Sequence, residues 1–368
     1  MSNKTFGILS DTHNHGWTAF SEVNESGINN RLQMILDETV RCATEAKDAG
    51  GETMYHTGDL FHVRGSVAPS VLNPTLDTYR SIIEMGVKVR ILAGNHDLEF
   101  REANRNGSAV TALEGVGCEI VNETTLFQDD RVAMVPWFQN TEELKAEILR
   151  VVSLIQATSS PAPLRSMECV SDWTLMIHAP IDGVIKGLPS HGLTDEWLAA
   201  RGFKRVFSGH YHNHKDFGNG VFSVGALTHN SWSDVGSKAG FLIADKDEVR
   251  WRKSHAPGFV EVNGSMSEVD IALAADGNYV RCTLTSDKAE EVEGVRQFLL
   301  DSGAKGINIL YQKKVVEVER EEVSTVSAGA SIETSVTDYV SRFKSTNPKA
   351  LSALCHSILE DARMELSK

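Results

Sequence analysis

Three short apolar runs near the N-terminus, each followed at once by polar residues, place the strongest constraint on how this chain folds. They cover residues 4–9, 52–56 and 87–93 and end in Ser-Asp-Thr-His, Thr-Gly-Asp and Gly-Asn-His-Asp. Between them, residues 29–49 and 76–85 carry apolar side chains at helical spacing. Strands that alternate with helices predict a parallel sheet with right-handed connections, and therefore an α/β fold. Functional residues of such sheets lie at the carboxyl ends of the strands.

The same arrangement recurs further along the chain. Residues 173–177 predict a strand that ends in His178, and residues 205–207 predict a strand followed by Ser-Gly-His-Tyr-His. Other elements are expected between these segments: helices at 109–114 and 142–154, and strands at 119–121 and 132–135. Five strand ends therefore carry polar clusters, which are costly to bury unless something binds them.

Carboxylates, imidazoles and one amide at these strand ends form a set of candidate metal ligands. The set comprises Asp11, His13, Asp59, Asn95, His178, His210 and His212. Such donors suit manganese, iron or zinc better than magnesium alone. Seven ligands are too many for one ion but fit two ions that share a carboxylate, and Asp59 is the candidate bridge. Metal pairs of this kind lie roughly 3.5–4 Å apart and clamp the oxygens of a phosphoryl centre. A lone Asp-x-His or His-x-His is usually a capping or surface pattern, so the joint pattern carries the prediction.

Composition limits the partners and the compartment. The 368 residues are 41% hydrophobic and 23% charged, which is ordinary for a soluble globular protein. No basic stretch with a long apolar run begins the chain, and no segment is apolar for long enough to span a bilayer. Five scattered cysteines without a Cys-x-x-Cys pair favour a reducing cytoplasm. Because the formal net charge is −14, action on nucleic acid would need bound cations or a partner protein to supply positive field.

The last hundred residues have a different character. Residues 279–284, 289–300 and 307–318 predict a strand, a helix and a strand, which form a small α+β unit. Residues 319–335 are rich in Glu, Ser and Thr and predict a linker. Residues 336–366 have a helical pattern interrupted by Asn-Pro. A helical hairpin this short has little core of its own, so we expect it to need a surface to dock on.

The motifs SDTH, TGDLFH, AGNHD, IHAP and SGHYHNH resemble the five signatures of the calcineurin-like metallophosphoesterase superfamily. Within it, the segment Gly-Asp-Leu-Phe-His that ends at His62 most resembles the SbcD-type nucleases of DNA double-strand-break repair and their phage relatives. The resemblance implies an α/β fold in which a metallophosphoesterase β-sandwich is flanked by helices, as α/β/β/α layers, over residues 1–260. It further implies an α+β DNA-capping domain at 265–318. After the 319–335 linker, a C-terminal helical hairpin at 336–368 would dock on an SbcC-type coiled-coil ATPase.

The resemblance also assigns roles to single residues. Asp11, His13, Asp59 and His212 would hold one divalent ion, and Asp59, Asn95, His178 and His210 the other. Manganese is the expected metal, with iron, zinc or magnesium as alternatives. His96 would contact the phosphate and help the leaving oxygen depart, Asp97 would orient His96 by a hydrogen bond, and His62 would help to place the nucleic-acid backbone.

The function implied is a DNA exonuclease and single-strand endonuclease, the catalytic subunit of an SbcCD-like repair or recombination complex in a bacterial or phage-infected cytoplasm. The family also implies a homodimer, for which the helices at 29–49 and 69–86 are candidates unless their apolar faces belong to the core. One alternative is a phosphodiesterase for small or cyclic nucleotides, which would not need the C-terminal hundred residues. Another is a scaffold with a structural metal site, which would not need His96.

Five further histidines are expected outside the ligand set. His15 and His214 depart from the family pattern and are expected to face solvent or to support the ligands. His191, His229 and His255 are expected to be structural or at the surface. His229 follows a segment that ends near the site in this superfamily, so it is also a weak candidate for a substrate contact.

Overall fold

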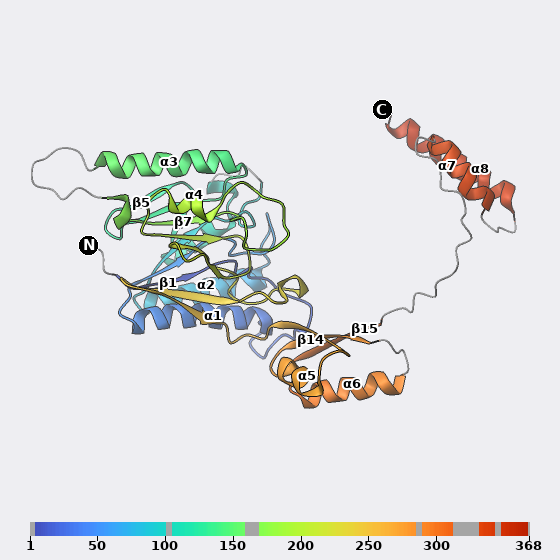
Figure 1. Cartoon of the computed structure of the whole chain (residues 1–368), viewed down its shortest axis with the longest axis horizontal. Helices are drawn as coiled ribbons and strands as arrows, with labels where there is room; N and C mark the ends of the chain where they lie inside the picture. The colour runs from blue at the N-terminus through green and yellow to red at the C-terminus, as the bar shows by residue number, and fades with distance from the viewer. Residues whose placement is uncertain are drawn as a thin grey trace, which may run out of the picture. The chain divides into compact units, whose positions relative to one another are not determined.

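The computed structural model describes residues 4–100, 105–158, 169–284, 289–311, 331–342 and 347–366. The chain divides into two compact units, residues 1–312 and 313–368 (Figure 1). Among the helices that the structure describes, none has the length and apolar character needed to cross a membrane.

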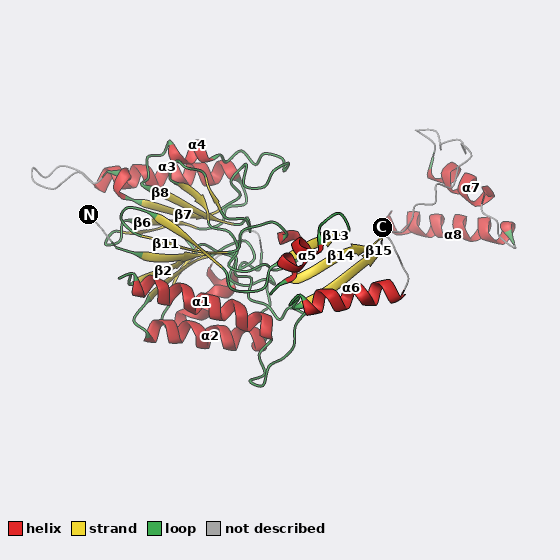
Figure 2. Cartoon of the chain, turned by 60° about the horizontal axis from the view of Figure 1, so that its bottom comes forward, coloured by secondary structure: helices red, strands yellow, loops and turns green. Residues whose placement is uncertain are grey.

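Two six-stranded sheets face each other in the first unit (Figure 2). The first consists of β1 (Phe6–Leu9), β2 (Thr53–His56), β3 (Lys88–Leu92), β4 (Glu119–Val121), β11 (Gly240–Ala244) and β12 (Val249–Lys253). The second consists of β5 (Thr125–Phe127), β6 (Val132–Val135), β7 (Thr174–His178), β8 (Arg205–Gly209), β9 (Lys215–Asp216) and β10 (Val221–Ser223). Their strand orders are β12-β11-β1-β2-β3-β4 and β5-β6-β7-β8-β10-β9. Strands β1 to β4 are parallel, as the alternation of the first hundred residues predicts.

Side chains alternate between two cores because neighbouring residues of a strand point to opposite faces. Ile8, Tyr55 and Phe207 lie in the core between the two sheets. Met54 and Ile91 point the other way, onto helices α1 (Asn30–Asp48) and α2 (Pro69–Glu84). Helices α3 (Thr141–Thr158) and α4 (Asp195–Ala199) cover the outer face of the second sheet (Figure 1). The α/β/β/α layers are confirmed.

Two elements differ from the sequence prediction. Helix α2 begins at Pro69, seven residues before the predicted start at 76, and it contains Pro74. A proline in the second turn removes one helical hydrogen bond, which the buried face of the helix outweighs. The predicted helix at 109–114 is a 3₁₀ helix, Ala109–Val116. The apolar faces of α1 and α2 are buried on the first sheet and belong to the core, which the sequence analysis allowed; a homodimer stays a prediction.

A third sheet completes the first unit. It consists of the parallel strands β13 (Phe259–Asn263), β14 (Tyr279–Leu284) and β15 (Gly306–Tyr311). Helices α5 (Glu268–Ala275) and α6 (Ala289–Asp301) accompany it. Strand β13 crosses the predicted domain boundary at 260, and α5 was not predicted. The predicted strand at 307–318 is described only as far as Tyr311, and residues 312–318 lie outside the described residues.

The second unit contains helices α7 (Ile332–Arg342) and α8 (Pro348–Leu366). Thr337 Oγ1 lies 3.2 Å from His356 Nε2, and Arg363 forms an ion pair with Glu333, so the two helices contact each other. Helix α7 begins four residues earlier than the predicted 336, within the predicted linker; residues 319–330 of that linker lie outside the described residues. A docking role for this pair stays a prediction.

Candidate metal centre

All seven predicted metal ligands lie at one edge of the sandwich, where the carboxyl ends of β1, β2, β3, β7 and β8 meet. The contacts below join ligands that are up to 199 positions apart in the chain. The two sheets therefore assemble the site, and no single local segment contains it.

The first cluster consists of Asp11, His13 and His212, with one ligand atom from each within 4.8 Å of the others. The Nε2 atoms of His13 and His212 are 3.1 Å apart. Two facing ring nitrogens can share only one proton, whereas a cation between them would bind both lone pairs. His13 Nε2 also lies 3.8 Å from Asp59 Oδ2.

The second cluster consists of Asp59, His178 and His210, again with ligand atoms within 4.8 Å of one another. His178 Nε2 lies 3.4 Å from Asp59 Oδ1 and 3.1 Å from Asn95 Oδ1. His210 Nδ1 lies 2.9 Å from the same Asn95 oxygen. Asp59 directs one oxygen toward each cluster, which is the arrangement of a bridging carboxylate. The donors of both clusters thus fit two divalent ions.

The backbone at the ligands is unusual. Four ligands have positive φ angles, in the left-handed region that residues other than glycine rarely adopt. The angles are 49° at Asp11, 45° at His13, 57° at Asp59 and 100° at His210. The backbone N–H of Asp11 donates to the Gly58 carbonyl at 3.0 Å, and that of His13 donates to the Asp59 carbonyl at 3.1 Å. These bonds hold the ends of β1 and β2 together in the strained conformation.

Two glycines make the close approach of the strand ends possible. A Cβ atom on Gly58, where φ is 106°, would lie 2.3 Å from His178 Nδ1. A Cβ atom on Gly94 would lie 2.3 Å from the Asp59 backbone nitrogen. Space therefore requires glycine before the polar residues of both the Gly-Asp and the Gly-Asn-His-Asp motifs, and at Gly58 the positive φ requires it as well.

Hydrogen bonds at the far ring nitrogens fix the direction of two ligand imidazoles. His178 Nδ1 donates to the Thr57 carbonyl at 2.8 Å, and His212 Nδ1 donates to Asp234 Oδ1 at 2.7 Å. Both bonds leave the Nε2 atom of the same ring directed at the clusters. Hydrogen-bond partners of metal-bound histidines commonly orient the ring in this way. Asp234 was missed by the sequence analysis. The Ser231-x-x-Asp234 capping-box pattern could have located its turn but not its contact with His212.

A tryptophan also supports the second cluster. The Trp137 ring stacks on the His210 ring, with centroids 5.1 Å apart and an interplanar angle of 22°. The Trp137 and His178 rings lie edge to face, with their centroids 5.9 Å apart. Trp137 follows strand β6 and its backbone N–H donates to the Ala93 carbonyl. The sequence analysis missed this residue as well.

The electrostatics match a site prepared for cations. Burial opposes charge on Asp59, yet His178 and the other nearby imidazoles hold the pKa of Asp59 far below its ordinary value. Burial likewise opposes the proton on His178, but Asp59 raises the pKa of His178 to about 9. Burial and His178 lower the pKa of His210 to about 3, so its ring is neutral near pH 7. Metal binding would release the His178 proton, because a ligand imidazole must be neutral.

His96 lies beside the clusters without belonging to the predicted ligand set. Its Nδ1 lies 2.7 Å from the His62 carbonyl, which leaves Nε2 as the free nitrogen. Its ring centroid is 4.9 Å from that of His13 and 5.7 Å from that of His62. One ring nitrogen each of His13, His62 and His96 falls within 4.8 Å of the others. The structure thus brings His62 and His96 to the same edge as the ligands.

The predicted hydrogen bond from Asp97 to the His96 ring requires correction. The Asp97 oxygens accept the backbone N–H groups of Phe61 at 3.0 Å and Gly94 at 2.9 Å. Burial and Asp59 raise the pKa of this carboxyl group to about 7. Asp97 therefore joins the segments that follow β2 and β3, while the His62 carbonyl orients His96.

The remaining histidines have separate roles. His229 Nε2 donates to the Ser237 carbonyl at 3.0 Å, and its Nδ1 accepts the Phe259 N–H at 3.0 Å. With both ring nitrogens engaged, His229 secures the start of β13, which corrects the idea of a substrate contact. His214 Nδ1 donates to a backbone carbonyl at 2.8 Å, and its ring stacks on Trp251.

Three further histidines were also expected to lie outside the ligand set. His15 is partly buried, with its ring centroid 5.1 Å from that of His62. His191 and His255 are exposed at the surface. The structural or surface interpretation fits these two histidines.

The family model described as calcineurin-like phosphoesterase matches residues 4–214 of the chain. This is more than half of the chain, so the chain belongs to the calcineurin-like phosphoesterase family. Members of this family are metal-dependent phosphoester hydrolases that use two divalent ions, and the two clusters described above provide donors for two.

Two solved structures are similar to the chain. A dimetal phosphatase from Danio rerio is 11% identical, with 69% of this chain and 97% of that chain covered and a TM-score of 0.39. The nuclease MPE from Pseudomonas putida is 14% identical, with 67% and 86% covered and a TM-score of 0.29. At these identities and TM-scores, neither similarity bears on the substrate. No curated protein matches the chain.

Proposed function

We propose that this protein is a DNA nuclease of SbcD type, in which the two-metal centre hydrolyses phosphodiester bonds. The observation that carries the choice of DNA is a pair of neighbouring hollows, the first of which lies at the metal ligands; we take them together as one groove. One hollow of about 540 Å³ is lined by His210, His212 and Lys186. A second hollow, of about 720 Å³, is lined by Lys238 and Lys253 and shares Gly236 and Ser237 with the first.

The charge of this groove supports a polyanionic substrate. Lys186, Lys238 and Lys253 line it although the whole chain carries a net charge of −14. Of the two carboxylates that line it, Asp234 is already bonded to His212, and Asp276 lies at the far end, in the α+β unit. A cyclic nucleotide would fill only a small part of such a groove, whereas a nucleic-acid strand would follow it.

The α+β unit forms one wall of the groove and is firmly attached to the sandwich. Phe20 stacks on Tyr279 with centroids 5.0 Å apart and an interplanar angle of 11°. The Arg31 guanidinium lies 5.1 Å from the Phe259 ring and donates to the Asn230 carbonyl at 2.8 Å. This attachment supports the proposed role of the unit in positioning DNA beside the metal centre.

In the proposed reaction, the protein's own groups position the phosphodiester and move protons. Two divalent ions would supply the Lewis acidity that activates water and neutralises charge on the phosphoryl oxygens. Since the His62 carbonyl holds His96 Nδ1–H, the protonated ring can donate Nε2–H to the leaving oxygen. Asp234 and the Thr57 carbonyl keep His212 and His178 in the orientation that binds cations.

The partners belong to the same proposal. Helices α7 and α8 expose Ile332, Tyr339, Leu354 and Ile358, which suits docking on a coiled-coil ATPase. Such an ATPase would add the positive surface that an acidic nuclease needs. A homodimer would have to use a surface other than the buried faces of α1 and α2. A cytoplasmic location in a bacterial or phage-infected cell follows from this assignment.

The test compares DNA cleavage by wild type, His96→Ala and His191→Ala, with and without Mn²⁺, on linear duplex, single-stranded and closed-circular DNA. We expect Mn²⁺-dependent cleavage that falls by about 10²–10⁴-fold in His96→Ala, because proton donation is lost. Mn²⁺ binding should be unchanged in that variant. The exposed His191 provides the matched control and should retain full activity.

A second comparison separates DNA from small substrates. Lys238→Glu combined with Lys253→Glu reverses two charges in the groove without altering a ligand. We expect this variant to lose DNA cleavage and to keep hydrolysis of a small chromogenic diester. Equal activity on DNA would contradict the groove as the DNA path. If wild type cleaves only the small diester, with and without the ATPase, the alternative of a small-substrate phosphodiesterase holds.

A further inference from the structure

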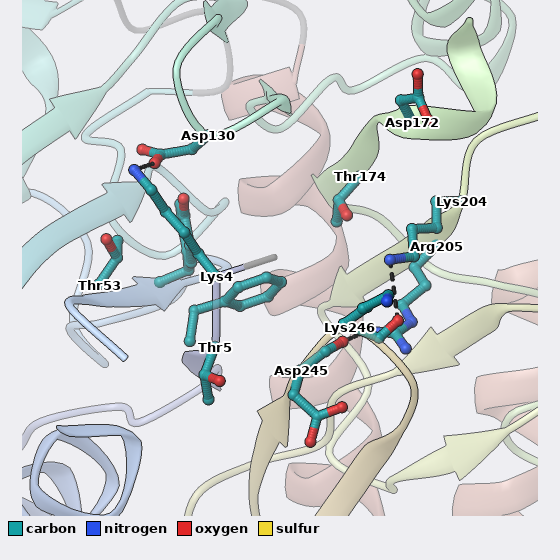
Figure 3. Close-up of a pocket in the computed structure, with 12 residues that line it drawn as sticks. Lys4, Thr5, Thr53, Asp130, Asp172, Thr174, Lys204, Arg205, Asp245 and Lys246 are labelled. Carbon is teal, nitrogen blue, oxygen red and sulfur yellow. Dashed lines mark hydrogen bonds and ion pairs between the residues drawn. The ribbon is translucent and has the colours of Figure 1, made fainter. Parts of the chain in front are cut away.

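A small polar cavity of about 30 Å³ lies between the two sheets, at the edge opposite the metal centre, and Figure 3 shows the residues that line it. Its walls include Phe6, Thr53, Thr174 and Arg205, which stand at the starts of β1, β2, β7 and β8. The metal ligands follow the ends of these same strands. Phe6 and Asp11 are five residues apart, which corresponds to about 16 Å of extended strand.

Each carboxylate that lines this cavity already has a cationic partner. Lys4 Nζ lies 2.7 Å from Asp130, which also pairs with Arg90 (Figure 3 shows the Lys4 contact). Asp172 pairs with Arg131 at 3.1 Å. The third carboxylate, of Asp245, pairs with Arg250 at 3.3 Å and accepts two backbone N–H groups. These acids are therefore largely neutralised by their own partners.

Three cations on the other side of the cavity have no such partner. Lys204 Nζ donates to the Lys246 carbonyl at 3.0 Å, and the Arg205 guanidinium donates to the Asp245 carbonyl. No ion pair joins Lys204, Arg205 or Lys246 to a carboxylate within the residues that the structure describes. Arg205 is only 8% exposed. A buried guanidinium that donates to a neutral carbonyl and forms no ion pair has its positive charge only partly compensated.

Burial, more than any neighbouring charge, disfavours the charged forms of Arg205 and Lys204. Burial lowers the pKa of Arg205, and Asp245 and Asp247 only partly oppose this effect. Burial, followed by repulsion from Arg205, lowers the pKa of Lys204. An anion in the cavity would remove both penalties.

We propose that this cavity is a binding site for a phosphate-type oxyanion, held by Arg205 with Lys204 and Lys246. The flat guanidinium of Arg205 suits bidentate binding of two phosphate oxygens, and the two lysines add flexible ammonium donors at the mouth. The hydroxyl groups of Thr5 and Thr174 line the same space and can donate to the remaining oxygens. The ligand is either free inorganic phosphate or a terminal phosphate of a nucleotide or nucleic acid. This site is distinct from the metal centre and does not depend on the proposed nuclease activity.

Calorimetric titration of the full-length protein with inorganic phosphate tests the proposal. A metal chelator and constant ionic strength keep phosphate from acting at the metal centre or by screening alone. We expect saturable binding by wild type and at least tenfold weaker binding by the double variant Lys204→Gln and Lys246→Gln. Both lysines are exposed, so the fold should survive. Lys88→Gln is the control, because Lys88 starts β3 at the same edge, is exposed, and lies outside the cavity.

The outcomes are decisive in each arm. Absence of saturable phosphate binding by wild type, or equal binding by all three proteins, overturns the proposal. Competition by an oligonucleotide with a 5′-phosphate, but not by the same oligonucleotide without it, identifies a terminal phosphate as a ligand. Competition by neither identifies free phosphate. Because the chelated protein performs no hydrolysis, failure here leaves the proposed nuclease function untouched.

Discussion

Asp234 gives the sharpest test of the metal centre, because it acts on one ion only. Its Oδ1 accepts His212 Nδ1–H at 2.7 Å, while Oδ2 accepts the N–H groups of Asn230 at 2.7 Å and Ser231 at 2.9 Å. In Asp234→Asn the amide oxygen can keep the two backbone donors, so the amide NH₂ then faces His212. That NH₂ needs an acceptor, which moves the ring proton of neutral His212 from Nδ1 to Nε2. The nitrogen that faces the first cluster would thereby lose its free lone pair.

The expected magnitude follows from this change of tautomer. Loss of a supporting partner of a metal-bound histidine typically lowers metal affinity by about 10–100-fold. This corresponds to about 1.4–2.7 kcal/mol for the first ion. His210, Asn95 and His178 are untouched by the substitution, so the second ion should keep its affinity. The buried turn retains its backbone bonds, so the fold should be preserved.

Mn²⁺ titration of the metal-free protein by calorimetry should therefore show one weakened and one unchanged binding event. Asp182→Asn is the matched control, because Asp182 also accepts two backbone N–H groups, at 2.7 and 3.0 Å, and contacts no metal ligand. Two unchanged events would show that Asp234 does not select the His212 tautomer. Equal weakening of both events, with a lower melting temperature, would show that the substitution acts through the fold.

Three further predictions concern other parts of the chain. Gly94→Ala would place a Cβ atom 2.3 Å from the Asp59 nitrogen. We therefore expect the free energy of unfolding to fall by about 1–3 kcal/mol and Mn²⁺ to bind more weakly. Denaturation and Mn²⁺ titration curves identical to those of wild type would contradict this. Burial opposes charge on Asp130, but hydrogen bonds from Lys4 and Arg90 hold the pKa of Asp130 below the ordinary 3.8. Its contribution to stability is present above that value and is lost as pH falls below it, so Asp130→Asn should flatten the acid side of a pH–denaturation profile, and an unchanged slope would refute the pairing. Removal of residues 331–368 should abolish association with a coiled-coil ATPase and leave small-diester hydrolysis intact; loss of that hydrolysis would contradict docking as the role of α7 and α8.

The sequence was sufficient to predict the ligand-bearing strand ends. Strand β3 occupies Lys88–Leu92 within the predicted 87–93, and β2 occupies Thr53–His56 within the predicted 52–56. An apolar run that stops at glycine and polar residues is a local signal, since a buried strand needs both the run and the stop. The family's parallel sheet then brings those ends to one edge. The predicted fold class and placement of the ligands both derive from this combination.

The supporting contacts had no local signal. Asp234 lies 22 positions from His212, and Asp97 binds a backbone group 36 positions away. Nothing in a carboxylate's neighbourhood in the sequence specifies which distant N–H it will meet. Strand β13 was missed for the same reason. Its five residues form a strand because they pair in parallel with β14, which lies sixteen or more positions later in the chain. Helix α2 begins seven residues before the predicted start and contains Pro74, because burial of its apolar face outweighs the hydrogen bond that the proline removes.

The strained backbone at the metal centre connects the ligand-bearing strand ends with the distant contacts that support them. Left-handed conformations at residues other than glycine cost of order 1–3 kcal/mol each, and the metal centre contains four. The strain persists because backbone bonds from Asp11 and His13 to the segment after β2 fix it, and because the Asp11 carboxylate accepts the His210 N–H at 3.0 Å. None of these bonds uses a lone pair of a ligand imidazole. The fold therefore holds the ligands in place before a cation binds. Because the loops are already ordered, little of the free energy of metal binding is lost to ordering them, and the affinity is higher.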